Sequence, residues 1–462
     1  MPDLSQMKRH LDERIKTMPP VRIIVASFFL LIALGTLFLT LPVASASGAF
    51  THPLDALFTA TSATCVTGLS VVDTTSHWNV FGQVVILLLI QMGGLGLSTF
   101  ATGFSLLVHR RLGLREMVLT GEASGGNMPD AASLLKLMLG FTFACELAGA
   151  GLLMFRLVPE YGIGGIWPAI FVSISAYCNA GFDILGFIPG NSSLTAFVGD
   201  PLVCLTISGL IITGGLGFVV VRDIYQSKFL SPMRHQGRKR LNFHSQICLR
   251  ATLIILLFST LGFFLLEYRR TMGNLSLFEK LNAAFFQAVN TRTAGFASVD
   301  IAAQDSFTKV LSVALMFIGG CPGSTAGGVK TTTLVVLLVT VLSTLRGQEE
   351  AVVLRHRFSH RVVYKSLTVV LLGLAVVFAD ACALTLLNPQ LHFVDLLYES
   401  ASALGTAGLS ASITTRLEPV SRLILCVTMF IGRVGPLSFG LSILMRAKSS
   451  PSVLPEGRML IG

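Results

Sequence analysis

Four short segments of this chain combine residue types and spacing that suit cation coordination. Each opens with an aromatic residue and ends ten positions later in glycine: Phe58 to Gly68, Phe171 to Gly181, Phe285 to Gly295 and Tyr398 to Gly408. The glycines are 113, 114 and 113 positions apart, which indicates one unit repeated four times. Glycine allows backbone angles that turn carbonyl oxygens toward an axis, and such oxygens can replace the water shell of an ion. The repeats therefore predict four loops around one ion path.

The residues that precede each glycine form the candidate filter. We expect the ligands to be backbone carbonyl oxygens, because the side chains at these positions vary. The alternative is that the glycines only pack membrane helices together, but four in register favour a filter. The candidate filter residues are Val66, Thr67, Gly68, Asn179, Ala180, Gly181, Thr293, Ala294, Gly295, Thr406, Ala407 and Gly408.

The composition indicates an integral membrane protein. Hydrophobic residues make up 52% of the 462 residues, charged residues only 13%, and the mean hydropathy is +0.74. Segments such as Ile23 to Leu41 run for about 20 nearly uncharged residues, enough to cross roughly 30 Å of hydrocarbon. Helices are expected, because backbone polar groups in lipid must be satisfied within their own segment.

Each repeat predicts a span, a half-length helix and a second span. The half-length helices, about ten residues each, reach only half way across a bilayer. They are predicted at 54–63, 167–176, 279–289 and 394–403. The first spans are predicted at 21–41, 133–155, 251–268 and 362–387, and the second at 82–108, 200–221, 307–345 and 419–445.

The expected fold class is therefore an all-α membrane protein. Four covalently linked M1–pore helix–M2 repeats would surround one ion pore with pseudo-fourfold symmetry, as in a potassium channel. The predicted divisions are a cytoplasmic arm (1–20), repeat 1 (21–108), repeat 2 with its link (109–232), repeat 3 with a broken second inner helix (233–346), repeat 4 (347–446) and a cytoplasmic tail (447–462).

Charge predicts the orientation. Most of the 34 lysines and arginines lie in the N-terminal arm, the links between repeats and the C-terminus, so both termini are expected in the cytoplasm. The net charge of +10 does not indicate nucleic-acid binding, since the basic residues follow the membrane topology. A cleavable leader is the alternative for residues 23–41, but this segment occupies the place of a first span.

Enzyme chemistry has no support in the sequence. The eight cysteines are scattered singly, without a CxxC pair or a Cys/His cluster at metal-ligand spacing. No constellation of His, Asp and Ser suggests catalysis. We expect neither an enzyme nor a nucleotide site in this chain.

The second spans share a glycine motif that changes in the last repeat. Gly93-Gly94-Leu95-Gly96 matches Gly214-Gly215-Leu216-Gly217, whereas the corresponding residues of repeat 4 are Gly432-Arg433-Val434-Gly435. A charge inside a span is costly and suggests function. Arg433 is a candidate barrier to cations below the filter; the alternative is a structural pair with Glu399 or Asp380.

The third repeat has a helix-breaking segment at this place. Residues 319–328 contain five glycines and a proline, so the third inner helix must be interrupted. A phosphate loop is the alternative, but Val329 separates Gly328 from Lys330 and no strand precedes the segment.

The whole pattern resembles the Trk/Ktr/HKT superfamily of potassium transporters, most closely the membrane subunits of bacterial Ktr systems. The resemblance rests on Thr64–Leu69, Asn179–Asp183, Asn290–Phe296 and Gly405–Leu409, each with one filter glycine. It implies K+ as the transported ion and a gate loop in the interrupted segment. The implied gate residues are Gly319, Gly320, Gly323, Ser324, Thr325, Gly327, Gly328 and Lys330.

The resemblance also implies an assembly and a location. It implies a homodimer in the bacterial cytoplasmic (inner) membrane, docked on a cytosolic nucleotide-binding ring of the KtrA type. Sodium, as a cotransported or activating ion, stays open. Two alternatives remain: a secondary transporter with alternating access around a midplane site, and a sodium-selective member of the superfamily. The predicted repeats are parallel, which favours a pore.

Overall fold

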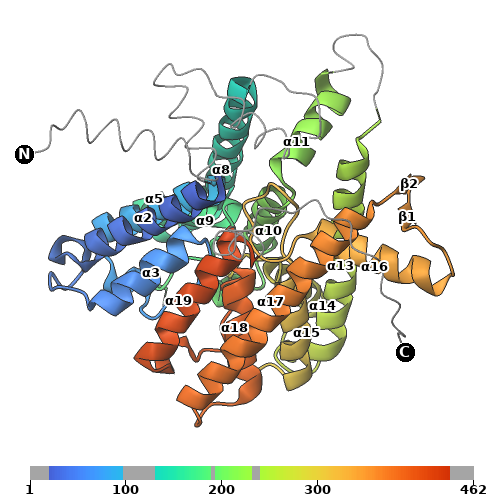
Figure 1. The fold of residues 1–462 in the computed structure, drawn as a ribbon. Helices are drawn as coiled ribbons and strands as arrows, with labels where there is room; N and C mark the ends of the chain where they lie inside the picture. Colours follow the sequence, from blue (N-terminus) through green and yellow to red (C-terminus); the bar gives the residue numbers. More distant parts are fainter. Residues whose placement is uncertain (1–19, 97–130, 189–192, 231–239, 437–462) are drawn as a thin grey trace, which may run out of the picture.

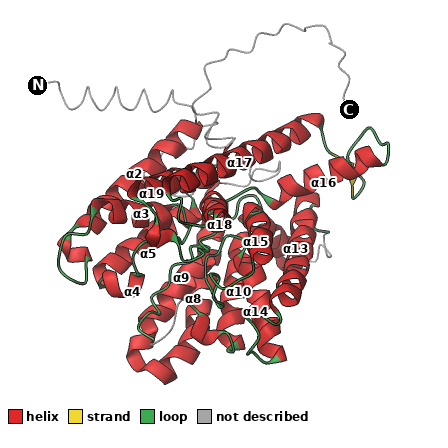
Figure 2. Ribbon diagram, turned by 90° about the horizontal axis from the view of Figure 1, so that it is seen from below, coloured by secondary structure: helices red, strands yellow, loops and turns green. Residues whose placement is uncertain are grey.

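The computed structural model describes residues 20–96, 131–188, 193–230 and 240–436. Within them the chain is almost entirely helical (Figure 2), with one short antiparallel pair, β1 (Val352–Val353) and β2 (His356–Arg357). Several of the predicted segments lie outside these residues. They are the N-terminal arm up to residue 19, the link 109–130, most of the basic segment 234–240 and the tail 447–462. The second span of repeat 1 beyond residue 96 and that of repeat 4 beyond residue 436 lie outside them as well.

Three kinds of helix recur in the same order along the chain (Figure 1). The long outer helices are α2 (Pro20–Thr40), α8 (Ala131–Tyr161), α13 (Phe243–Glu267) and α17 (His360–Leu387). The pore helices are α3 (Pro53–Thr64), α9 (Ile166–Tyr177), α14 (Leu277–Asn290) and α18 (Phe393–Gly405). The inner helices are α5 (Val80–Leu95), α10 (Pro201–Gly215), α15 (Ser306–Phe317) and α19 (Pro419–Val434), continued in repeats 2 and 3 by α11 (Phe218–Ile224) and α16 (Thr331–Leu345).

Short elements connect these helices. They are α4 (Thr74–His77), a π-helical turn η4 (Tyr225–Leu230) after α11, and the 3-10 turns η1 (Pro42–Ala44), η2 (Gly162–Gly165), η3 (Thr195–Phe197) and η5 (Thr414–Arg416).

The pore helices agree with the predicted half-length segments to within two residues at each end. Their first turns contain signals that start a helix. Asp55, Glu279 and Asp395 lie in the first turns of α3, α14 and α18, where a negative charge stabilises the helix dipole. In α14, Ser276 and Glu279 form a reciprocal capping box. The opposite end of each pore helix leads directly into a predicted filter loop.

The inner helices differ from the prediction of continuous second spans in repeats 1, 2 and 4. After α10 the chain turns by 98° into α11, so the predicted span 200–221 is wrong as one helix. Helices α5 and α19 end at the corresponding glycines. Gly96, Gly217 and Gly435 have φ of +79°, +87° and +93°, which a right-handed helix cannot accommodate. The expected interruption of the third inner helix is present, between α15 and α16.

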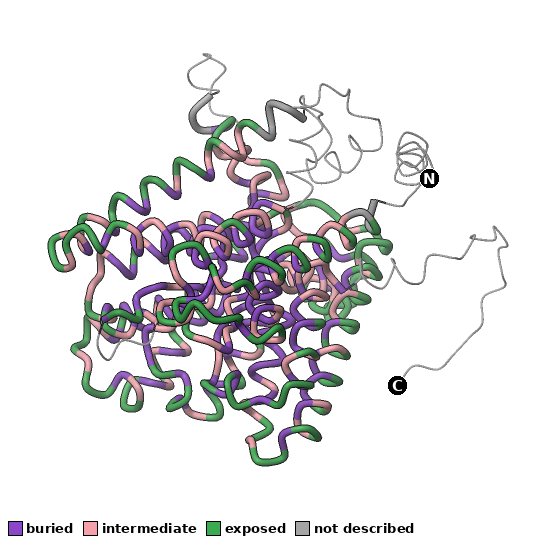
Figure 3. Tube along the Cα trace, turned by 90° about the vertical axis from the view of Figure 1, so that its left-hand side faces the viewer, coloured by how far each residue is buried: buried purple, intermediate pink, exposed green. Residues whose placement is uncertain are grey.

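Membrane-spanning character is concentrated in the outer helices. In the described part of the chain three helical segments are long and apolar enough to cross a membrane, and four if the bent α10–α11 pair counts as one span. Within the described residues the inner helices fall short, because α10 and α15 are interrupted and α5 and α19 each extend over only 16 residues. The exposed residues lie mostly at the periphery of the described chain and the buried ones in its interior (Figure 3). Large apolar side chains such as Phe29, Phe155 and Leu386 are exposed, as a lipid-facing surface requires.

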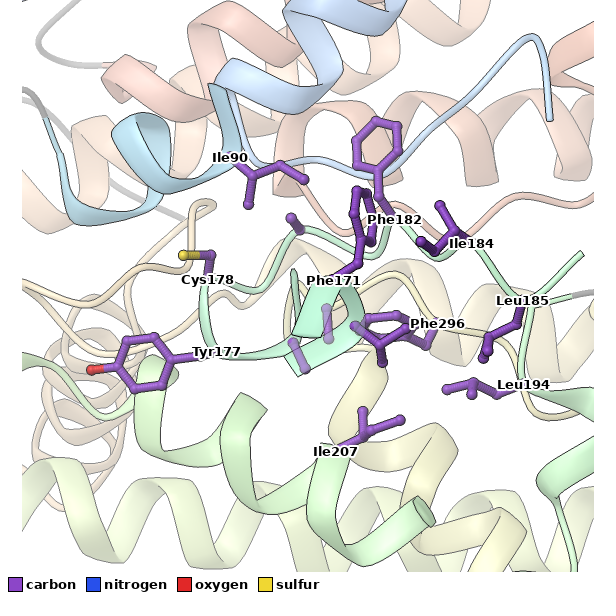
Figure 4. Packing of buried hydrophobic residues seen from close by; sticks show 14 of the residues in the cluster. Ile90, Phe171, Tyr177, Cys178, Phe182, Ile184, Leu185, Leu194, Ile207 and Phe296 are labelled. Carbon is purple, nitrogen blue, oxygen red and sulfur yellow. The ribbon is translucent and has the colours of Figure 1, made fainter. Parts of the chain in front are cut away.

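The centre of the molecule is a packed core built on the pore helices. Phe171 of α9, Phe182 and Phe296 of the following loops, and Ile207 of α10 pack together (Figure 4). Small residues predominate in the last turns of α3 and α18, which lets the inner helices α5 and α19 pack closely against them. The core therefore holds the four loops in place.

Polar contacts in the N-terminal halves of the pore helices join each repeat to the next. Each involves a side chain on or beside a pore helix. They are Trp167 Nε1 to Gln83 Oε1 (2.7 Å), Asn282 Nδ2 to the Val198 carbonyl (2.9 Å), Lys309 Nζ to Asp395 Oδ1 (2.7 Å) and Arg422 Nη1 to Asp55 Oδ1 (3.0 Å). The last contact closes the ring by joining repeat 4 to repeat 1.

Candidate functional site

The four glycine loops share one unusual backbone conformation. Each has positive φ at two positions, the glycine and the residue two before it. The φ angles at the glycines are 98° (Gly68), 69° (Gly181), 87° (Gly295) and 77° (Gly408). Two residues before each glycine they are 57° (Val66), 61° (Asn179), 65° (Thr293) and 50° (Thr406). Positive φ is especially unfavourable for β-branched residues such as valine and threonine. Strain of this kind persists where the surrounding structure imposes it, often for function.

Each loop is fixed to the end of its own pore helix. The amides of Thr67, Ala180 and Ala407 each donate to the serine carbonyl five residues earlier at 2.8 Å. In repeat 3, Ala294 donates to the carbonyl of Asn290 at 3.0 Å. Side chains add to this in two loops: Ser62 Oγ accepts from Gly68 N and Asn290 Oδ1 accepts from Phe296 N, both at 3.1 Å.

The four loops converge and form a closed ring. Each glycine faces the backbone of a loop in a neighbouring repeat, so closely that a β-carbon would meet it. A Cβ on Gly68 would lie 2.5 Å from the Ala180 carbonyl oxygen, one on Gly181 2.6 Å from that of Ala294, and one on Gly295 3.1 Å from that of Ala407, while one on Gly408 would overlap that of Thr67. The order of contacts is repeat 1 to 2 to 3 to 4 and back to 1.

A cavity opens on the side of the ring where the pore helices begin. It has a volume of about 930 Å3, and its lining includes all four filter glycines. Three carboxylates, Asp73, Asp183 and Asp300, and several hydroxyl groups also line it, whereas no lysine or arginine among the described residues does. A cavity with such an acidic lining attracts cations.

The interrupted segment of repeat 3 lies against the opposite side of the filter. A Cβ on Gly327 would overlap the side chain of Thr406, and Thr325 Oγ1 lies 3.2 Å from the Tyr177 carbonyl and 3.3 Å from Asn179 Oδ1. The segment therefore contacts filter residues of repeats 2 and 4.

The broken inner helix of repeat 2 holds this segment. Cys321 and Thr325 donate their amides to the carbonyls of Gly215 (2.9 Å) and Gly214 (3.2 Å), and Phe218 donates to Gly323 at 3.0 Å. A Cβ on Gly217 would lie 2.5 Å from the Pro322 carbonyl. The bend in α10–α11 thus makes room for the segment, which explains why this helix is not continuous.

The remaining predicted gate residues form the base of the segment. Gly319 N donates to the Val329 carbonyl at 2.8 Å, and Thr331 N donates to Gly320 at 3.1 Å, so the two ends are tied together. Lys330 Nζ donates back to the carbonyls of Ala326 (2.7 Å) and Gly327 (3.3 Å). Gly323 and Gly328 have φ of +70° and +64°, and Ser324 is half-buried.

Arg433 links three repeats below the filter. Its guanidinium donates to the Thr325 carbonyl of repeat 3 and to the Gly93 carbonyl of repeat 1, and a longer bond reaches Gly94 at 3.4 Å. The alternative pairing with a carboxylate is wrong for Glu399, which accepts instead from Ser410, Ala411 and Thr414. No ion pair joins Arg433 to Asp380 among the described residues.

Some relationships at this site have no signal in the sequence. The sequence suggests Glu399 only as a partner for Arg433, because spacing along the chain cannot show which loop returns to a buried carboxylate. The contact between Asn179 and Thr325 joins residues 146 positions apart. The inner-helix breaks have a weak signal, the last glycine of each motif.

The ring of loops, the cavity with acidic side chains on one side and the segment of repeat 3 on the other define a four-repeat pore-loop membrane protein. The TrkH family, described as cation transport proteins, matches residues 3–454. The chain is 40% identical over 452 residues to Ktr system potassium uptake protein B of Bacillus subtilis, covering 96% of this chain and 97% of that protein. It is 36% identical over 469 residues to potassium/sodium uptake protein NtpJ of Enterococcus hirae, covering 99% and 100%.

A solved structure supports the fold. The potassium transporter TrkH from Vibrio parahaemolyticus aligns with a TM-score of 0.73 at 20% identity, covering 92% of this chain and 84% of that one. This chain belongs to the TrkH family of cation transport proteins, and the predicted membership of the Trk/Ktr/HKT superfamily is confirmed. The expected fold class is confirmed as well.

Proposed function

We propose that this chain is the membrane subunit of a potassium uptake system and that K+ crosses it through the ring of glycine loops. The observation that carries the proposal is the closed contact order of Gly68, Gly181, Gly295 and Gly408. The names of the relatives support K+ as the ion. Each repeat contributes one glycine, so the filter is simpler than one built from TVGYG loops.

The chemistry of the ring suits a weakly hydrated monovalent cation. The filter offers backbone carbonyl oxygens, and the ends of the pore helices that face it are the partially negative C-terminal ends. The hydroxyl oxygens of Thr67, Thr293 and Thr406 are also buried there without a hydrogen-bond partner among the described residues. Oxygen atoms that have no hydrogen-bond partner can coordinate K+ after it loses water.

The interrupted segment 319–328 would act as the gate. It lies against Asn179 and Thr406 and so stands on the ion path directly beyond the filter. Its glycines give it the freedom to move, and its hydrogen bonds to Gly214 and Gly215 hold it in the observed position. The gate residues are those that the family resemblance implies, from Gly319 to Lys330.

Arg433 would serve two roles at the gate. Its positive charge below the filter raises the barrier for a cation. Its hydrogen bond to Thr325 also holds the gate segment against the ring, because the same guanidinium is anchored on Gly93. Neutralising Arg433 would remove both effects.

Other parts of the proposal follow from the family. We propose the repeat boundaries given above, a homodimer in the bacterial cytoplasmic membrane with both termini inside, and a cytosolic nucleotide-binding partner of the KtrA type. Sodium would be either cotransported or activating. The rival function is sodium-selective uptake, and the name of one relative, potassium/sodium uptake protein NtpJ, supports it.

Reconstitution tests the proposal. The purified chain in proteoliposomes, with and without its regulatory partner, should take up K+ down an imposed membrane potential faster than Na+. Uptake of Na+ at the same rate or faster would overturn potassium selectivity. An absence of uptake of either ion in both conditions would overturn the pore itself.

A further inference from the structure

A fully buried carboxylate stands behind the filter of repeat 4. Glu399 belongs to pore helix α18, one residue after the aromatic residue that marks the repeat, and none of its surface is exposed. At the corresponding places the other pore helices have Thr59, Val172 and Phe286. Only the fourth repeat therefore places an acidic side chain at this level of the pore helix.

Glu399 accepts three hydrogen bonds, all from the segment that follows the filter glycine Gly408. Ser410 Oγ donates to Oε1 at 2.5 Å, Ala411 N donates to the same oxygen at 3.2 Å, and Thr414 Oγ1 donates to Oε2 at 3.1 Å. Ser410 in turn accepts from Ser412 N at 3.0 Å and lies 2.9 Å from Thr414 Oγ1. One side chain thus organises the segment 410–414.

This segment is also the wall of the ion entrance. Gly408, Leu409, Ser410, Ser412 and Thr414 all line the cavity above the ring. Since Ser410 is two residues from the filter glycine, a shift of residues 410–414 would be transmitted to the carbonyls of Ala407 and Gly408. Removing a buried acceptor of several hydrogen bonds leaves its donors unsatisfied, which costs more than the bonds themselves contribute.

We infer that Glu399 is a positioning residue for ion selectivity, which fixes the outer end of the fourth filter loop from behind. It does not touch the ion. It sets where the filter carbonyls of repeat 4 stand. In repeats 1 and 3, which lack the carboxylate, Ser62 and Asn290 near the ends of the pore helices accept from the loop amides instead. This inference rests on the proposed potassium filter.

The test compares three variants in proteoliposomes: Glu399→Ala, Glu399→Gln and Glu267→Ala. Glu267, the last residue of α13, is a matched control, because it is also fully buried and accepts from Thr308 Oγ1 (2.6 Å) and Thr271 Oγ1 (2.8 Å). Thr271 lines the same cavity, but neither hydroxyl belongs to a glycine loop. Thermal midpoint and gel filtration in detergent report folding. The ratio of K+ to Na+ uptake reports selectivity.

We expect Glu399→Ala to lower the K+/Na+ ratio by about tenfold, since small displacements of coordinating groups have large effects. Glu399→Gln should restore most of the ratio, because an amide oxygen can still accept from Ala411 and Ser410 while its amide donates to Thr414. Glu267→Ala should lower the thermal midpoint and leave the ratio unchanged. A ratio in Glu399→Ala equal to the parent, or an equal loss in Glu267→Ala, would overturn the inference.

If Glu399→Ala fails to fold, Ser410→Ala provides the same readout, since it removes one donor and retains the carboxylate. A parent protein without K+ preference would count against the proposed filter, and not against Glu399 specifically. The two failures are therefore distinguishable.

Discussion

Arg433, in the last inner helix, donates a hydrogen bond to the backbone carbonyl of Thr325, 108 positions earlier in the chain. The same guanidinium also reaches Gly93. A charge on a rigid helix is thereby tied to the glycine-rich segment below the ring. If the segment is the proposed gate, its position depends on the hydrogen bond that Arg433 donates to Thr325.

We predict that Arg433→Ala increases K+ flux about tenfold or more. The charge would no longer repel a passing cation, an effect of about 2 kcal/mol at roughly 8 Å and an effective dielectric constant of about 20. The gate segment would also lose its anchor. Stopped-flow or isotope uptake in proteoliposomes measures this. Arg433→Lys is the control for charge, and an unchanged flux in the alanine variant would contradict both roles.

We predict that shortening the segment Gly323–Gly328 also raises flux. The deletion removes the part that contacts Asn179 and Thr406, so the path beyond the filter should open. Ser324→Ala keeps the length and the backbone contacts of the segment, so it should change flux much less than the deletion does. Flux at or below the parent level in a folded deletion variant would remove the gate proposal.

We predict that Gly295→Ser weakens the preference for K+ over Na+. Its φ of +87° strains any residue with a side chain, at a cost of about 1–3 kcal/mol. A Cβ there would also lie 3.0 Å from the Cα of Gly181 and 3.1 Å from the Ala407 carbonyl oxygen. The uptake ratio measures the effect.

Gly347→Ser is the matched control for this substitution. Gly347 has φ of +70°, but a Cβ added to it would meet nothing within 4 Å, so strain is present without a clash. Its substitution should affect stability alone. Equal selectivity in Gly295→Ser and the parent would argue against the filter assignment.

We predict that Arg422→Ala destabilises the protein by about 1–3 kcal/mol. The Arg422–Asp55 pair closes the ring between repeats 4 and 1, and its side chains are only 20% and 24% exposed. Arg422 also donates to the carbonyls of Thr415 and Leu417. Thermal unfolding in detergent measures the change.

The exposed pair Arg357–Glu350 provides the comparison. Its side chains are 72% and 47% exposed, so Arg357→Ala should cost less than about 1 kcal/mol. Similar midpoints for Arg422→Ala and Arg357→Ala would show that the closing contact between repeats 4 and 1 stabilises the protein no more than an exposed ion pair does.

The sequence alone was sufficient for the repeat and its parts. A glycine every 113 or 114 positions, with ten-residue polar segments between long apolar runs, indicated four half-length helices, and these agree with α3, α9, α14 and α18. Membrane helices are largely determined by local hydropathy, because each must satisfy its own backbone in lipid. The hydropathy of a segment therefore predicts whether that segment forms a membrane helix.

Only the tertiary structure determined where the inner helix of repeat 2 is interrupted and which residues contact each other across repeats. The prediction of a continuous second span at 200–221 was wrong, because the segment of repeat 3 donates to Gly214 and Gly215 and takes the place of the next turn. The partners of Arg433 and Glu399 were likewise undetermined. Both side chains bind backbone or hydroxyl groups whose identity leaves no pattern along the chain, since any residue offers a carbonyl. Only the convergence of distant repeats on one axis determines which carbonyl is near.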